Sequence, residues 1–258
     1  MRLSQYFKLV DMQARMALKA DASQYFLGYI WWLLEPLIFV GVFYFVFNVI
    51  LASGRDDFFI FLMCGKLPYV WFSKSITHSQ RSIIANVGLI GNIDIPKTMF
   101  PMAMIQEGVY KLATVFLLLI LVLVNFGYSP STIWFWLIPV IIVNYIMIVA
   151  CAFIASVLVC FIRDISMFIP LGLLFLMFAS GIFWDVRDLP DTEMAELILT
   201  YNPLAFLLDA YRQILMFQTR PDLTQLMQIG LFFAVITAFM VGWMRKFSRL
   251  LALKALTA

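Results

Sequence analysis

Long runs of hydrophobic residues, separated by short polar segments, follow one another along this chain from residue 28 to residue 244. A helix needs roughly 20 apolar residues to cross the hydrocarbon core of a bilayer, and most of these runs are long enough. The second run is the weakest prediction, because Lys66, Pro68 and Lys74 interrupt it. The pattern predicts six transmembrane helices, near 28–52, 58–78, 102–126, 133–161, 166–184 and 224–244.

Composition supports this interpretation. The chain has 258 residues, of which 64% are hydrophobic and 13% charged, whereas a soluble domain carries about 25% charged residues. We therefore expect an all-α polytopic membrane protein, with residues 1–258 forming a single transmembrane domain and no soluble domain. The net charge of +3 is small and no run of Lys or Arg occurs, which argues against nucleic-acid binding.

The first 22 residues mix polar and apolar positions, so they predict neither a span nor a cleavable signal. At helical spacing, one face is apolar and the opposite face carries Lys8, Asp11, Arg15 and Lys19. Residues 1–22 are predicted to form an amphipathic helix in the head-group region, either as a simple anchor or as a lever that touches a cytoplasmic partner. The apolar face consists of Leu3, Tyr6, Phe7, Val10, Ala14, Ala17 and Leu18.

Basic residues are distributed unequally between the two sides of the predicted bundle. The N-terminus, the 79–101 loop, the 162–165 turn and the 245–258 tail together hold 11 basic residues and four acids. The opposite side holds four Arg and nine acids, seven of the acids between residues 185 and 222. Because basic residues collect on the cytoplasmic side, both termini are predicted to be cytoplasmic.

The segment 185–223, between the fifth and sixth predicted spans, is too long and too polar for a turn, yet it contains apolar stretches. Two short helices that dip back toward the membrane would explain this pattern, with Pro190 and Pro203 marking their starts. The hypothesis is an extracytoplasmic gate or vestibule; the alternative is an ordinary exposed loop.

Five ionisable residues fall inside predicted spans, where each must face protein, water or the interface. Glu107 and Lys111 are spaced i,i+4 and can neutralise each other. Glu35 precedes Pro36, where a loosened helix turn could offer it backbone partners. Lys66 and Lys74 could contact anionic sugars or a lipid pyrophosphate, or extend to the interface.

The chain contains no recognisable catalytic motif. The three cysteines lie in apolar runs and suit packing, and a single histidine, His78, cannot form a His-based metal site. No phosphate-binding G-x-x-x-x-G-K-[ST] is present, so the energy for any work must come from a gradient or from another chain. Such a chain would dock at the 79–101 loop, where Ile83, Ile84, Val87, Leu89 and Ile90 form a short amphipathic stretch.

Aromatic residues make up 17% of the chain. Most are expected to form interfacial belts, as in any membrane protein. A subset that faces an inner lumen could stack on sugar rings, and the candidates are Tyr69, Trp71, Phe72 and Trp184.

The segment from Gln24 to Leu37, QYFLGYIWWLLEPL, resembles the R-Y-x-x-S-x-L-G-Y-L-W-x-x-L-x-P-L signature of ABC type-2 permeases that export polysaccharides. It departs from the signature at Gln24 and Ile30. The matching residues are Tyr25, Leu27, Gly28, Tyr29, Trp31, Leu34, Pro36 and Leu37.

Three later segments are similar to the same family, in the same order along the chain. The first resembles its cytoplasmic coupling helix, the second its F-x-R-D-I turn, and the third its I-F, L-P and N-P-L run. The first segment contains Ser82, Ile83, Asn86, Leu89, Ile90 and Pro101. The second runs from Phe161 to Ile165. The third contains Gly181-Ile-Phe183, Leu189-Pro190 and Tyr201-Asn202-Pro203-Leu204.

The resemblance implies a half-transporter for O-antigen or capsule chains, as in the Wzm and KpsM group. Two copies would form a homodimeric pore for a lipid-linked polysaccharide in the bacterial inner membrane. Two copies of a separate cytoplasmic ABC ATPase, which binds ATP and Mg²⁺, would dock beneath it. The permease itself would have no catalytic residue and no cofactor.

The same resemblance assigns structural roles to individual residues. Coupling to the ATPase falls to Ile83, Asn86, Leu89 and Ile90, and the interface or gate motif to Tyr25, Gly28, Tyr29, Trp31, Glu35 and Pro36. The extracytoplasmic gate comprises Leu189, Pro190, Asn202 and Pro203, and the cytoplasmic turn Arg163 and Asp164.

Two other functions compete with polysaccharide export. One is a permease of the same architecture for a smaller lipid or drug. The other is a multi-span glycosyl- or acyltransferase, for which only Asp185, Asp188 and Asp191 come close to a clustered acid; their spacing also suits a solvated loop.

Overall fold

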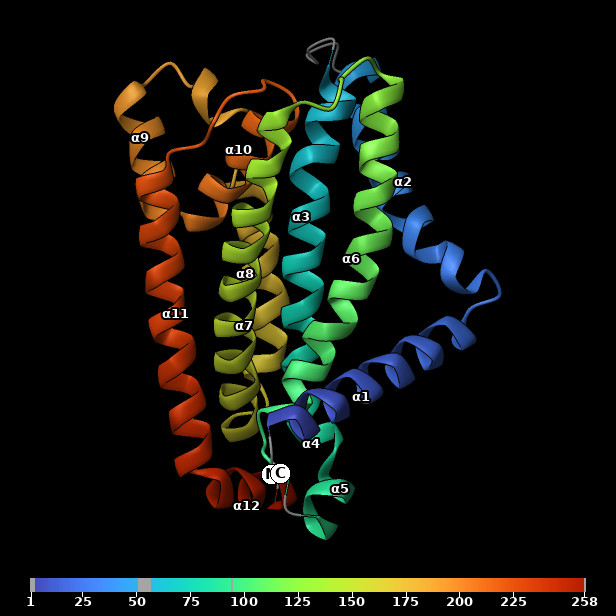
Figure 1. Cartoon of the computed structure of the whole chain (residues 1–258), viewed down its shortest axis with the longest axis vertical. Coiled ribbons are helices and arrows are strands. Elements are labelled where there is room, and N and C mark those ends of the chain that lie inside the picture. The colour runs from blue at the N-terminus through green and yellow to red at the C-terminus, as the bar shows by residue number, and fades with distance from the viewer. Residues whose placement is uncertain (1–2, 51–56, 94, 258) are drawn as a thin grey trace.

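The computed structural model describes residues 3–50, 57–93 and 95–257, which form helices joined by loops, with no strand among them (Figure 1). This confirms the predicted all-helical class. The elements are α1 (Leu3–Gln24), η1 (Gly28–Ile30), α2 (Trp31–Tyr44), η2 (Phe45–Ile50), α3 (Phe58–Ser79), α4 (Ser82–Ala85), α5 (Val87–Asn92), α6 (Met99–Asn125), η3 (Thr132–Trp136), α7 (Leu137–Phe161), α8 (Ile165–Ala179), η4 (Val186–Asp188), α9 (Thr192–Tyr201), α10 (Pro203–Leu215), α11 (Leu223–Lys246) and α12 (Ser248–Thr257).

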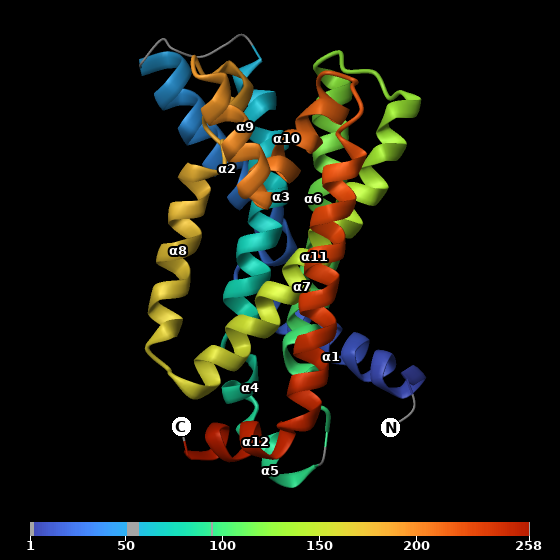
Figure 2. The same cartoon turned by 90° about the vertical axis from the view of Figure 1, so that its left-hand side faces the viewer.

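The helix α3 lies at the centre of the bundle, in contact with α2, α6, α7, α8 and α10 (Figures 1 and 2). Residues 60–69, Lys66 included, are all buried because neighbouring helices cover each face of this part of α3. On the outside of the bundle, α11 packs along α7, and α8 is mostly exposed. The second predicted span, which Lys66, Pro68 and Lys74 interrupt, is therefore the central helix of the bundle.

Among the described residues, four helices are long and apolar enough to cross a membrane: Gly28–Phe47, Met99–Asn125, Thr132–Phe161 and Leu223–Lys246. They correspond to the first, third, fourth and sixth predicted spans. The second corresponds to α3, which has 22 residues but is less apolar, and the fifth to α8, which has 15. Since the backbone turns at Gly181 (φ +71°), α8 ends at Ala179 rather than at 184. The predicted end of the first span, at 51–52, lies outside the described residues.

The bundle has two distinct ends. Both chain ends lie at one of them, together with α4, α5 and α12, and α9 and α10 lie at the other (Figure 2). The segments that the charge count groups together, the N-terminus, the 79–101 loop and the tail, thus share one end of the molecule.

The first helix crosses the bundle near the end that holds the termini and packs on α6 (Figure 1). Val10 and Ala14, from its predicted apolar face, are buried, whereas Leu3 and Phe7 on the same face stay exposed. On the polar face, Asp11 accepts a hydrogen bond from the Tyr110 hydroxyl of α6. The protein therefore covers part of the apolar face, and the remainder is free to meet lipid.

Two short helices occupy the segment 185–223, as its apolar stretches predict. Pro203 is the first residue of α10, and α9 begins at Thr192, just after Pro190. The residues of α10 from 204 to 215 are all buried, whereas α9 has none buried. The alternative of an ordinary exposed loop therefore fails for α10.

The basic residue of α10 lies inside the protein, although the sequence pattern groups it with a solvent-facing segment. Arg212 is 2% exposed, and its guanidinium donates from Nη1 to the Gly181 carbonyl at 2.7 Å and from Nη2 to the Ile182 carbonyl at 3.0 Å. It also lies 3.5 Å from the centre of the Phe61 ring of α3. Arg212 therefore ties α10 to the turn after α8 and to the core helix.

Candidate functional site

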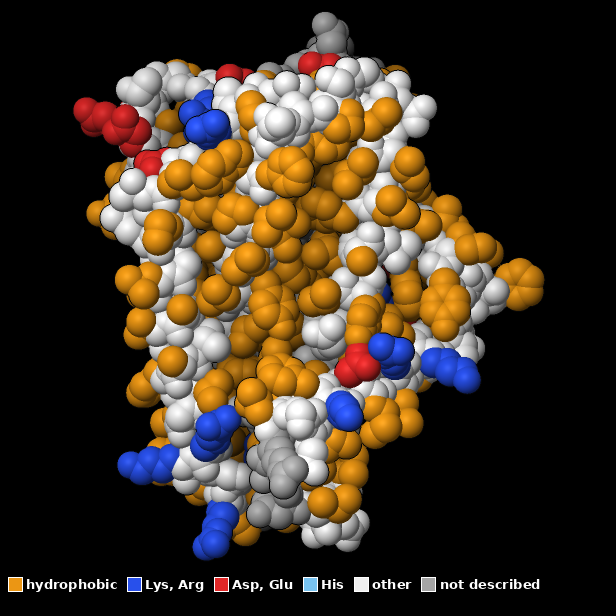
Figure 3. All heavy atoms as spheres, in the orientation of Figure 1, with side chains coloured by type: hydrophobic (Ala, Val, Ile, Leu, Met, Phe, Trp, Pro, Cys, Tyr) orange, Lys and Arg blue, Asp and Glu red, His pale blue; other side chains and the backbone are white. Residues whose placement is uncertain are grey.

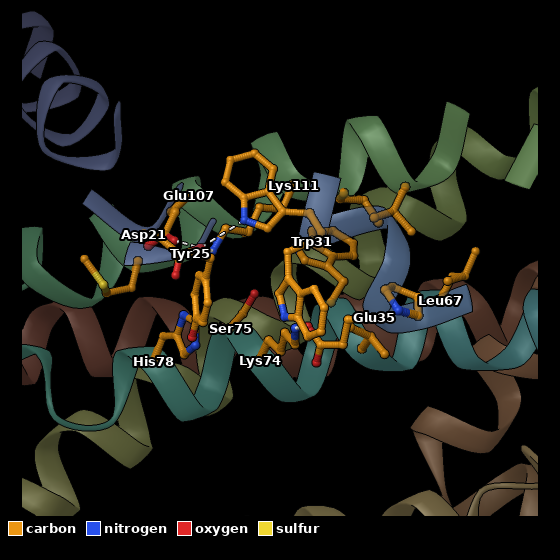
Figure 4. A pocket seen from close by; sticks show the side chains of 18 residues that line it. Asp21, Tyr25, Trp31, Glu35, Leu67, Lys74, Ser75, His78, Glu107 and Lys111 are labelled. Carbon is orange, nitrogen blue, oxygen red and sulfur yellow. Dashed lines mark hydrogen bonds and ion pairs between the residues drawn. The ribbon is translucent and has the colours of Figure 1, made fainter. Parts of the chain in front are cut away.

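A cavity of about 360 Å³ lies where α1 leads into α2, against α3 and α6. Three tryptophans line it, Trp31, Trp32 and Trp71, which gives it aromatic walls. Figure 4 shows polar side chains from all four helices directed into this space. The ionisable ones are Asp21, Glu35, Lys74, His78, Glu107 and Lys111.

The turn between α1 and α2 closes one side of the cavity. It depends on Gly28, whose φ of +50° disfavours a residue with a side chain. Tyr25 and Trp31 stack with ring centres 6.3 Å apart, and Tyr29 meets Trp32 edge-on at 4.9 Å. Four residues of the predicted gate motif, Tyr25, Gly28, Tyr29 and Trp31, thus build this turn.

A partly buried ion-pair cluster joins α1 to α6. Lys111 Nζ lies 2.7 Å from Asp21 Oδ2 and 2.6 Å from Glu107 Oε1, and Trp32 Nε1 also donates to Asp21 Oδ2 at 3.0 Å. Burial opposes ionisation of Asp21, but the hydrogen bond and charge of Lys111 outweigh it and lower the pKa of this carboxyl. The predicted pairing of Glu107 with Lys111 is confirmed, and Asp21 extends it to a second helix.

A second ion pair joins α2 to α3 across the cavity. Lys74 Nζ contacts Glu35 Oε2, and each side chain remains partly exposed. The sequence suggests backbone partners for Glu35 beside Pro36, and the structure pairs this carboxylate with Lys74 of α3. Pro36 itself is buried within α2 and lines the same cavity.

Two shielded polar atoms at the cavity, Trp71 Nε1 and Ser75 Oγ, have no hydrogen-bond partner in the described part of the chain. Gly108 of α6 makes room for them, since a Cβ at this position would lie 2.6 Å from Ser75 Oγ. A bound polar ligand or water would supply the missing hydrogen bonds. With three tryptophans nearby, the cavity could accept a molecule that has both hydroxyl groups and an apolar face.

The other aromatic candidates lie elsewhere. Tyr69 and Phe72 are buried on α3, where the Tyr69 hydroxyl donates to the Leu173 carbonyl of α8. Trp184 follows the end of α8 and donates to the Phe178 carbonyl at 2.9 Å. Only Trp71 of the four possible glycan-lining residues belongs to the described cavity at the α1–α2 turn.

Lys66 of α3 is buried rather than exposed to sugar or to the interface. Its Nζ lies 3.4 Å from the centre of the Phe39 ring and 3.2 Å from Met177 Sδ. This ammonium group is therefore held by an aromatic face and a sulfur atom in the core.

The predicted coupling segment forms α4 and α5. Ile83 and Ile90 are buried in the chain's own core, whereas Leu89 is 42% exposed. The Asn86 side chain donates to the Ser82 carbonyl at 2.8 Å. Of the four residues, Leu89 is thus the one with a large exposed apolar side chain.

The cytoplasmic-turn and gate residues lie at opposite ends of α8. Arg163 and Asp164 are exposed in the turn before it. Beyond its other end, Asn202 caps α10 by accepting hydrogen bonds from the backbone N–H groups of the next turn at 3.1 Å, and donates to Ser180 Oγ at 3.1 Å. Pro203 follows as the first residue of α10, and Leu189 and Pro190 lie in the connection before α9.

Two of the three acids considered for catalysis, Asp185 and Asp191, serve as helix caps. Asp185 accepts a hydrogen bond from the Arg187 backbone at 3.0 Å, and Asp191 caps α9. Within residues 3–50, 57–93 and 95–257, no three His, Cys, Asp or Glu side chains are grouped so that they could hold a metal ion.

Asp21, Trp32, His78 and Gly108 also line the cavity at the α1–α2 turn, and the sequence pattern does not bring them together. Asp21 is one of the four acids on the predicted cytoplasmic side, and Gly108 follows Glu107 directly in the sequence. The one available signal was the tandem Trp31-Trp32, which marks the turn where α1 meets α2.

Comparisons with known proteins agree on one family. The family model of the ABC-2 type transporter matches residues 92–216. Two O-antigen export system permease proteins RfbA of Klebsiella pneumoniae are each 30% identical over 216 residues, which is 83% of this chain and 82% of each relative. The RfbA protein of Myxococcus xanthus is 24% identical over 232 residues, 88% of both chains. By this similarity over most of its length, the chain belongs to the ABC-2 type transporter family, among relatives of the O-antigen export permeases.

Proposed function

We propose that this protein is the membrane subunit of an ATP-driven exporter that moves a lipid-linked polysaccharide, of the O-antigen type, across the bacterial inner membrane. The observation that carries the proposal is its similarity, over more than four fifths of the chain, to proteins named as O-antigen export permeases. Capsule chains are a related substrate class for the same architecture.

The proposed assembly contains two copies of this chain and two copies of a cytoplasmic ABC ATPase that binds ATP and Mg²⁺. We place α3 and α8 in the membrane with the four long apolar helices, which makes six spans. The excess of basic residues at the end that holds both termini supports a cytoplasmic location for that end.

The cavity at the α1–α2 turn is proposed to act as a mechanical joint. Asp21 connects α1 to α6 through Lys111, and Glu35 connects α2 to α3 through Lys74. A movement of α1 would therefore be transmitted to α6 through the Asp21–Lys111 pair, and a movement of α2 to α3 through the Glu35–Lys74 pair. Trp71 and Ser75 give the same joint polar groups that a sugar residue could occupy.

The ATPase is proposed to engage α5. Leu89 and Ile93 present exposed apolar side chains at the end of the bundle that holds the termini, which suits insertion into a partner's groove. Ile90→Asp would not test this contact, because Ile90 is buried and a carboxylate there would disturb the protein's own core. Leu89→Asp changes the exposed surface alone, so it should abolish co-purification of the ATPase while the protein still inserts; unchanged co-purification would exclude this surface.

The experiment for the whole proposal deletes the gene in a strain that makes the polysaccharide and measures surface glycan. The expected result is loss of surface glycan with lipid-linked chains accumulating inside, restored by the wild-type gene. A deletion that leaves surface glycan normal refutes polysaccharide export. If drug resistance or lipid distribution changes instead, the smaller-substrate alternative holds.

A further inference from the structure

A second cavity, of about 950 Å³, lies at the end of the molecule that holds both termini. Its walls come from the start of α1, the connection before α6, and α7, α11 and α12. Four cationic side chains line it, Lys97, Arg245, Lys246 and Arg249, and no described acid does. None of these four forms an ion pair with a described residue. Such a concentration of one charge attracts an anionic ligand.

The cavity is more than a patch of surface charge. Lys97 is only 4% exposed, and a buried ammonium group is costly unless an anion or hydrogen-bond acceptors surround it. Beside it, the Tyr6 hydroxyl of α1 donates to Thr98 Oγ1 at 3.2 Å, which fixes this wall of the cavity. The arrangement has the features of a preformed anion site.

The rest of the lining is apolar. Val149 and Phe153 of α7 face the cavity together with Val241 and Met244 of α11. In Figure 3, Lys and Arg side chains gather over the lower end of the molecule, below a band of hydrophobic side chains carried by α6, α7 and α11. The ligand should therefore have an anionic head and a hydrocarbon tail that extends toward the middle of the bundle.

One polar atom within the apolar part distinguishes between kinds of tail. Thr237 Oγ1 is shielded, lines the cavity and has no described hydrogen-bond partner. It precedes Arg245 by eight residues on α11, roughly 12 Å along the helix axis. The ester carbonyls of a diacyl lipid, which lie between the head group and the acyl chains, could accept a hydrogen bond from the Thr237 hydroxyl. A polyprenyl chain has no such acceptor.

We propose that this cavity binds an anionic phospholipid of the cytoplasmic leaflet, with the phosphate near Lys97, Arg245 and Arg249 and an acyl chain along α7 and α11. Basic pockets between transmembrane helices on the cytoplasmic side commonly hold such head groups. The lipid would join α1 and α12 to the bundle. The inference requires that the protein is embedded in a membrane, but not that it exports a particular substrate.

Native mass spectrometry of the purified protein, with its ATPase where the two co-purify, tests the proposal. The probes are phosphatidylglycerol, zwitterionic phosphatidylethanolamine and undecaprenyl phosphate. We expect retention of phosphatidylglycerol over phosphatidylethanolamine, and about tenfold weaker binding in the Lys97→Gln and Arg249→Gln variants, since each loses a contact to a charged group. Lys97→Arg and the exposed Lys19→Gln should bind like wild type.

Three outcomes would overturn it. Equal retention of the two phospholipids would show that binding is not selective for an anionic head group. Unchanged binding in Lys97→Gln and Arg249→Gln would show that the lipid binds outside this cavity. Displacement of phosphatidylglycerol by equimolar undecaprenyl phosphate assigns the cavity to the carrier lipid. Thr237→Val keeps the shape of the side chain and removes its hydroxyl, so it should weaken the binding of phosphatidylglycerol and leave the binding of undecaprenyl phosphate unchanged; equal effects on both would remove the proposed contact to an ester carbonyl. None of these measurements depends on export.

Discussion

The contact between Gly65 and Arg212 depends on the absence of a side chain. A Cβ at Gly65 would lie 2.5 Å from Arg212 Nη2 and 3.2 Å from its Cζ, so the guanidinium reaches the carbonyls of Gly181 and Ile182 only because residue 65 is glycine. Arg212 links α10, α3 and the turn after α8, so a methyl group added at residue 65 should disturb all three elements.

Gly65→Ala is expected to lower stability by about 2 kcal/mol, because Arg212 must leave at least one buried charge-assisted hydrogen bond. Thermal unfolding in detergent measures the effect. Gly242→Ala is the matched control, since a Cβ there meets nothing within 4 Å. Equal melting temperatures for the two variants would show that Arg212 relaxes without loss.

At the scale of the element, Asn202 has two separable roles at the start of α10. Its Oδ1 caps the helix, and its Nδ2 donates to Ser180 Oγ after α8. Asn202→Ala should cost about 1 kcal/mol for the cap alone, plus the loss of the link to Ser180. Asn202→Asp keeps the cap and loses only the donor, so its unfolding temperature should lie between those of wild type and Asn202→Ala; a value equal to wild type would make the link to Ser180 irrelevant.

We expect the Asp21–Lys111 pair to help hold α1 against α6. Because the pKa of Asp21 is lowered, the pair is complete above the usual aspartate value of about 3.9 and is lost as pH falls through the lower folded value. Lys111→Met should therefore increase hydrogen exchange in α1 at neutral pH. Lys19→Met, at an exposed position on the same helix, should leave exchange unchanged. Equal exchange in both variants would mean that apolar packing alone holds α1.

At the scale of the whole molecule, the proposed topology is open to chemical labelling. In a variant without Cys64, Cys151 and Cys160, Leu253→Cys on α12 and Thr219→Cys in the α10–α11 connection lie at opposite ends of the bundle. A membrane-impermeant maleimide added to intact spheroplasts should label position 219 and not 253. Labelling of 253 alone would invert the orientation, and labelling of both would reject six spans.

Local patterns of the sequence are sufficient to predict the helical class, the positions of the long apolar helices and the sharing of one end by the basic segments. These features depend on local properties, hydropathy over about 20 residues and counts of charge, which any fold of the chain must respect. Glu107 and Lys111 belong to the same group, because one helical turn separates them.

Contacts between residues far apart in the sequence became visible only in the folded chain. Lys111 and Asp21 are 90 positions apart, Lys74 and Glu35 are 39 apart, and Arg212 reaches a carbonyl 151 positions away. No periodicity of the sequence specifies such pairs, since they depend on how whole helices pack. The same holds for the burial of Arg212 and Lys97. Charged side chains are expected at the surface, but neighbouring helices cover both of these. Arg212 thereby links three elements, and Lys97 becomes part of the proposed lipid site.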